Sequence, residues 1–156
     1  MHWRLFLAVA LLSLGSCGQK PTISIQVFPA VPAADPAAPA PAGWERAEFG
    51  GSTHGAAGVY YVKPDTLLSE WSIVACRSVS QPEGGLGAAV RLNAFAIRKM
   101  GEFSADPANS RKPLAMRING RWADFFPLLD RINDRMVLYG FTEQELKTLD
   151  QYLASR

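Results

Sequence analysis

The chain has 156 residues, of which 48% are hydrophobic and 19% are charged, and its formal net charge is +2. This length and composition fit one folded domain with or without a tail, and they exclude a chain that is disordered throughout or a multispan membrane protein. The small net charge argues against a nucleic-acid surface, because binding to phosphates relies on a concentrated basic patch.

The first 17 residues have the features of a bacterial export signal. Arg4 supplies a positive charge, and a nearly continuous apolar run follows over 5–14. A helix of that length reaches about 15 Å, roughly half of a bilayer core, so the run is too short to span as an anchor. The run leads into Leu-Gly-Ser-Cys, which resembles the lipobox of bacterial lipoproteins. An ordinary secretory signal with a chance cysteine is the alternative.

We therefore expect a signal peptide over 1–17, lipidation of Cys17, and a protein anchored to a membrane of the bacterial envelope and facing the periplasm. Gly18 stands where an aspartate would favour retention in the inner membrane. A glycine at this position favours sorting to the outer membrane, whereas a role beside the translocation channel requires the inner membrane. The choice between the two membranes stays open.

Few side chains suited to catalysis remain outside the leader. His54 lies in a glycine-rich stretch without the features of a phosphate loop, and we expect it to be a solvated loop residue. Cys76 lies in a strand-like run and is expected to be a buried small apolar residue, without a disulfide partner. An acid–base pair would have to come from carboxylates outside any known motif, namely Glu83, Asp106, Asp124, Asp130 and Asp134. We expect no enzyme, no catalytic residue, no metal and no cofactor.

Residues 18–58 predict a linker. Six prolines alternate with alanines between 21 and 42, and glycines follow at 50–55. Proline removes a backbone donor and favours an extended, semi-stiff backbone, so this segment is expected to lift a domain off a lipid surface. A short strand over 23–28 is the alternative for one part of it.

The folded domain is expected over 59–156, opening with the β-favouring run 59–62. Strands are predicted near 70–79 and 88–92, followed by a helix capped by Asn93 and ended at Asp106-Pro107. Alternating apolar residues on both sides of Asn119-Gly120 predict a type I′ hairpin. A last strand over 135–139 leads into a helix with a Thr-x-x-Glu capping box at 142–145. Together these elements predict a single α+β domain, an antiparallel sheet with two helices on one face, in the order β-β-α-β-β-β-α.

Four aromatic residues exceed what one sheet face must bury: Phe95, Trp122, Phe125 and Phe126. Either they lie in the core or under the linker, or they form an exposed apolar patch for a protein partner. We name these four as candidate contact residues.

Three segments, taken in order, resemble one family. Residues 89–100 (AVRLNAFAIRKM), 111–121 (RKPLAMRINGR) and 136–146 (MVLYGFTEQEL) are similar to segments of SecD and SecDF preprotein translocase subunits. Leu67, Leu68, Ile73, Val74 and Arg77 match a preceding segment. The resemblance covers about 59–153 and implies the head of the first periplasmic domain, an α+β module thought to contact polypeptide leaving the channel. The transmembrane helices and the base of that domain have no counterpart here, so the resemblance does not imply a pump.

The leading hypothesis is therefore a lipid-tethered protein-binding domain that contacts exported polypeptide or the Sec machinery, with no nucleic-acid partner. Sheet edges can bind an extended chain through backbone hydrogen bonds, and exposed aromatics add apolar contact. The alternative is a structural or adaptor lipoprotein that docks another envelope protein, because one fold can serve unrelated functions.

Overall fold

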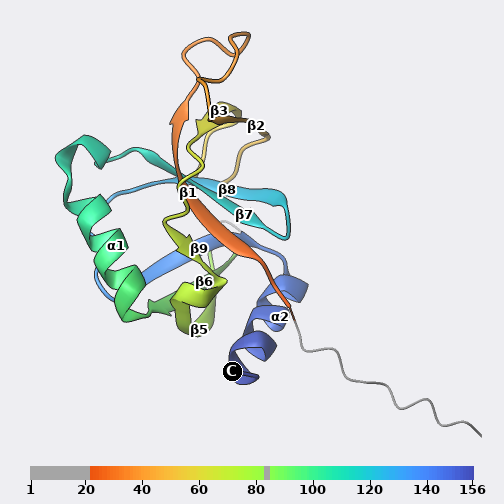
Figure 1. Ribbon diagram of the computed structural model, residues 1–156. Coiled ribbons are helices and arrows are strands. Elements are labelled where there is room, and N and C mark those ends of the chain that lie inside the picture. The colour runs from red at the N-terminus through yellow and green to blue at the C-terminus, as the bar shows by residue number, and fades with distance from the viewer. Residues whose placement is uncertain (1–21, 83–84) are drawn as a thin grey trace, which may run out of the picture.

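The computed structural model describes residues 22–82 and 85–156 (Figure 1). The predicted lipidation site Cys17 lies outside the described residues, as does Glu83. The strands are β1 (Ile25–Pro32), β2 (Glu45–Phe49), β3 (Gly58–Val62), β4 (Leu68–Ser69), β5 (Ile73–Ser80), β6 (Leu86–Leu92), β7 (Pro113–Ile118), β8 (Arg121–Pro127) and β9 (Arg135–Phe141). The helices are α1 (Ala94–Ala105) and α2 (Glu143–Ala154), with short 3₁₀ turns at Glu70–Ser72 and Pro107–Asn109.

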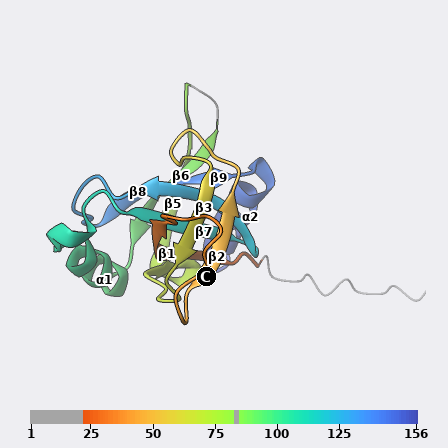
Figure 2. The ribbon, with the colours of Figure 1, turned by 90° about the horizontal axis from the view of Figure 1, so that it is seen from above.

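The strands form two antiparallel sheets. One sheet has the order β2-β3-β1-β7-β8, with β4 also pairing with β1, and the other has the order β5-β6-β9. The main core lies between them and takes in buried side chains of both helices, Ala96 and Met100 of α1 and Leu146 and Leu149 of α2. Figures 1 and 2 show the helices on opposite flanks of the strands. The α+β class and the antiparallel pairing are confirmed, with two sheets in place of one.

The predicted turns and caps have the expected geometry. Asn119 and Gly120 both have positive φ, 48° and 85°, as a type I′ turn between β7 and β8 requires. The Asn93 side chain accepts a hydrogen bond from the Ala96 N–H at 2.9 Å and caps α1. At the start of α2, Thr142 and Glu145 bond each other's backbone N–H groups in a capping box.

The linker prediction is wrong for residues 25–32 and 45–49. Strand β1 is central: it pairs with β7 on one side and with β3 and β4 on the other, and Ile25 and Val27 are fully buried. An extended proline-rich backbone has dihedrals close to those of a strand, so proline did not exclude pairing. Pro29 takes part through its carbonyl, which accepts the Lys63 N–H at 2.9 Å. Six strands thus precede α1, where the expected order had two.

Candidate functional site

The four predicted contact aromatics do not lie on one surface. Phe125 and Phe126 are only 1% and 8% exposed, so their prediction as surface contacts is wrong. Successive side chains of a strand point to opposite faces, and both faces of β8 are covered. Phe126 lies in the main core, and Phe125 stacks on Tyr60 at a centroid distance of 4.2 Å in a second cluster beneath β2 and β3. The cover over Phe125 includes Phe49, at a ring distance of 5.0 Å, from the segment that the sequence predicts to be a linker.

Trp122 is half-buried, and its ring packs against other side chains of the protein. The guanidinium of Arg117 lies 4.0 Å from the centroid of its ring, and Phe28 packs edge-on at 6.2 Å. Arg117 is itself held by an ion pair with Glu45 of β2. The Trp122 ring therefore closes the second cluster. Phe95 alone of the four is largely exposed, at 60%.

One edge of the smaller sheet is open. Strand β5 pairs with β6 along its length, and no described strand pairs with its other side. At the start of that side the Ile73 carbonyl accepts a hydrogen bond from Arg156 at 3.1 Å. A register shift between Ile73 and Ala75 marks a bulge, after which pairing with β6 is regular to Ser80. Residues 75–80 are therefore an edge whose outward backbone groups can pair with another chain.

Two other edge strands, β2 and β9, carry features that β5 lacks. Strand β2 carries three charged residues among its five, Glu45, Arg46 and Glu48, which discourage edge pairing. Near the end of β9, the Gly140 carbonyl accepts a hydrogen bond from Arg121 of β8 at 2.7 Å. Strand β5 has a single charged residue in eight and no proline. Its edge is the natural place for strand addition.

Exposed apolar side chains gather at the start of this edge. Trp71 is 62% exposed and Val74 is 44% exposed, and both lie beside the bulge. The side chain of Asn93 donates to the Trp71 carbonyl at 3.0 Å, which brings the first turn of α1, with Phe95, to the same end of β5. The Trp71 ring packs edge-on against Tyr152 at 6.1 Å. Sequence reasoning did not single out this Trp, which lies two residues before a strand whose residues are mostly exposed and include a single charge.

A groove runs between β5 and α2, with a volume of about 530 Å³. Its floor includes Cys76, which is half-buried rather than fully buried as expected. Burial, and then the nearby Asp150 carboxylate, raise the pKa of the Cys76 thiol. The thiol is therefore protonated at neutral pH, and its reactivity is low.

His54 is not the solvated loop residue that the sequence suggested. Its Nδ1 lies 3.2 Å from a carboxylate oxygen of Asp124, which is fully buried in β8. The other oxygen of Asp124 accepts the Ser52 hydroxyl at 2.6 Å and the Phe125 N–H at 2.7 Å. The Ser52 oxygen in turn accepts the N–H groups of His54 and Gly55. The Ser52 hydroxyl is directed to the carboxylate and not to the imidazole, so the cluster ties the 50–57 loop to β8.

Three further carboxylates weighed for acid–base chemistry lie in the described part of the chain. Asp106 accepts the Ala108 N–H and caps the short turn after α1, while Asp130 and Asp134 are exposed. Within 22–82 and 85–156, no three His, Cys, Asp or Glu residues are grouped so as to hold a metal ion. No helix in the described part of the chain is both long and apolar enough to cross a membrane.

The fold and the site define a small α+β domain with an open sheet edge at β5. No family model matches the chain, and no curated protein matches it. Two solved structures of SecDF are similar over 60% of the chain at 21% identity, with a TM-score of 0.48 in each case. One is described as a membrane component that enhances protein export, and the match covers 42% of that chain; the other is SecDF in a super-membrane-facing form, of which 13% is covered.

The chain thus spans less than half of either SecDF chain. These structures belong to the family that the three sequence segments resemble. A likeness of this degree says nothing of what the present chain binds.

Proposed function

We propose that the protein is a membrane-tethered, non-catalytic, protein-binding domain of the bacterial cell envelope that takes an extended polypeptide onto the free edge of β5. The observation that carries the proposal is the unpaired side of residues 75–80. The partner we favour is exported polypeptide or a component of the Sec machinery, the choice that the sequence resemblance suggests. The anchor is the predicted lipid on Cys17.

Backbone pairing suits a partner whose sequence varies. Each added hydrogen bond contributes about 0.5–1.5 kcal/mol net, independent of the partner's side chains, so a six-residue edge supports weak and reversible binding. The exposed rings of Trp71 and Phe95 at the start of the edge add apolar contact that tolerates many sequences.

The position of β1 also bears on the tether. Because β1 begins at Ile25, the eight residues from Cys17 to that strand span at most about 29 Å. A lipid on Cys17 would hold the domain close to the bilayer, in place of the long spacer that the linker prediction implied. Such a domain would meet polypeptide segments near the membrane surface.

Site-specific photocrosslinking in cells tests the proposal. A photoreactive residue is placed at Ser78, exposed on the β5 edge, or at Glu48, exposed on the β2 edge as the matched control. We expect adducts at Ser78 that mass spectrometry identifies as exported polypeptides or Sec components, and few adducts at Glu48. Equal adducts at both positions, or none at Ser78, would overturn the proposal.

The second candidate function is docking of a folded envelope protein, as an adaptor. The exposure of Trp71 and Phe95 favours it, because neighbouring apolar side chains fit a folded partner as well as an extended one. Crosslinks from these two positions to one envelope protein, with none from Ser78, would select this candidate.

A further inference from the structure

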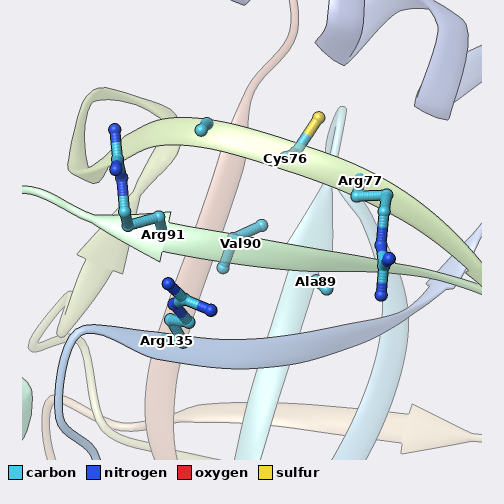
Figure 3. A pocket seen from close by; sticks show the side chains of 7 residues that line it. Cys76, Arg77, Ala89, Val90, Arg91 and Arg135 are labelled. Atoms are coloured by element: carbon cyan, nitrogen blue, oxygen red, sulfur yellow. The ribbon is translucent and has the colours of Figure 1, made fainter.

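The outer face of the β5-β6-β9 sheet carries three arginines. Figure 3 looks onto this face and shows the side chains of Arg77 from β5, Arg91 from β6 and Arg135 from β9, with Ala89 among them. These residues, with Ala75, line a hollow of about 420 Å³. Small side chains in the middle of the face leave room for groups from another molecule.

The strand register sets the arginines in two rows. Ala75 lies opposite Arg91, and Arg91 lies opposite Arg135 on the next strand. Arg77 starts the neighbouring row, opposite Ala89. Each row therefore begins on the open edge strand and runs inward across the sheet.

This arrangement is unfavourable in the free protein. Like charges directly opposite on neighbouring strands destabilise a sheet, and Arg91 faces Arg135 in this way. Arg135 has a 3.5 Å contact with Asp134, and both side chains are exposed. In the described part of the chain, Arg77 and Arg91 have no acidic partner. A repulsive pair in which Arg91 has no acidic partner and Arg135 has only an exposed one indicates a surface that an anionic group completes.

We propose that the segment paired with β5 carries acidic side chains at alternate positions, i and i+2, on the arginine face; this rests on the proposed function. A strand added along residues 75–80 would turn every second side chain to this face. A carboxylate opposite Arg77 meets it as a direct cross-strand pair. A carboxylate opposite Ala75 passes over that small side chain towards Arg91, where it relieves the repulsion with Arg135.

The side chains between these positions meet a different surface. They turn to the groove between β5 and α2, which Arg77 also borders and whose lining carries both basic and acidic residues, among them Lys147 and Asp150. Because this lining carries both positive and negative charges, it favours neither an acidic nor a basic side chain in the bound segment. Charge selection for the bound segment therefore comes from the arginine face.

An anionic lipid surface is the other ligand that three arginines fit. The register favours the peptide, because the rows begin at the very edge on which the chain would add. A lipid surface would need no such relation between the charges and the edge. The experiment below therefore also measures binding to lipid vesicles.

Three capped ten-residue peptides test the proposal against the full chain in neutral detergent, by fluorescence anisotropy. They carry glutamate, glutamine or lysine at every second position, with valine and threonine between. We expect the glutamate peptide to bind about twofold to thirtyfold more tightly than the glutamine peptide, the range for two cross-strand charge pairs, and the lysine peptide to bind most weakly. Arg77→Glu should reverse the order of the glutamate and lysine peptides.

Arg131→Glu is the matched control, since it makes the same charge change at an exposed site that does not line the hollow, and it should leave the order unchanged. Equal binding of the three peptides would overturn the acidic preference and leave the proposed function standing. Failure of all three would overturn both. Binding of a Cys17→Ser chain to phosphatidylglycerol vesicles, lost in Arg77→Glu, with no peptide preference, would assign the face to lipid and overturn the proposal.

Discussion

Replacing Ile25 by alanine tests whether the proline-rich segment belongs to the core. Ile25 is fully buried in β1, opposite Ile118 of β7, which is also fully buried. Removing a buried isoleucine side chain loses its transfer free energy and leaves a cavity, at about 2–5 kcal/mol. A domain of this size loses about 4 °C of melting temperature per kcal/mol, so we expect Tm to fall by about 8–20 °C.

The measurement is urea unfolding of the full chain followed by tryptophan fluorescence, together with thermal unfolding followed by circular dichroism. Leu129→Ala is the matched control, because it removes the same number of carbons at a residue that is 72% exposed, and it should change stability by less than about 0.5 kcal/mol. If Ile25→Ala behaves like Leu129→Ala, then β1 is not part of the folded core, and the reasoning from its burial is refuted.

Three further outcomes are expected. Gly140→Ala should lower stability by about 1–3 kcal/mol, because φ at this position is +83° and an added Cβ would lie 2.4 Å from a main-chain oxygen of β8. Burial would raise the pKa of the Glu145 carboxyl, but hydrogen bonds from Arg121 and from the N-cap backbone outweigh it and lower that pKa. Stability from this carboxylate should thus be full above the ordinary glutamate pKa of about 4.3 and be lost as the pH falls below it. The Cys76 thiol should react with a thiol reagent at pH 8 more slowly than free cysteine, and Asp150→Asn should speed it.

Each of these outcomes has a control. Gly43→Ala shares a positive φ, of 79°, but has open space around the added Cβ, so it should cost less than Gly140→Ala in the same urea assay. Glu145→Gln should flatten the loss of stability between pH 5 and pH 3, and an unchanged acid profile would contradict the role given to Arg121. A Cys76 rate equal to that of free cysteine would contradict its burial.

Local sequence patterns predicted the second half of the chain well. The Asn119-Gly120 pair, the Asn93 cap and the Thr142 capping box each specify geometry through residues close in the chain. The alternation around the hairpin and the apolar stripe of α2 follow the periods of strand and helix. These signals need no knowledge of distant contacts, and the structure has each of them in place.

The first half was misjudged because its order comes from distant partners. Prolines at 29 and 32 favour an extended backbone in a linker and in a strand alike, and the sequence has no local sign of which one is present. Strand β1 is held by β7, about 90 residues further on, with Ile25 opposite Ile118. For the same reason His54 could not be assigned to Asp124, since the two lie 70 positions apart.

The candidate site divides in the same way. The sequence alone determined the residue types: a strand-like run with one charged residue over 73–80, Trp71 before it, and one arginine in each of 73–80, 86–92 and 135–141. Only the tertiary structure decided that β5 stands at an open edge, that Phe125 and Phe126 are covered on both faces of β8, and that Arg91 faces Arg135. Side-chain chemistry and short-range periodicity are determined by residues that are close in the chain. Sheet edges, sheet faces and cross-strand partners are determined only when segments far apart in the chain pack together.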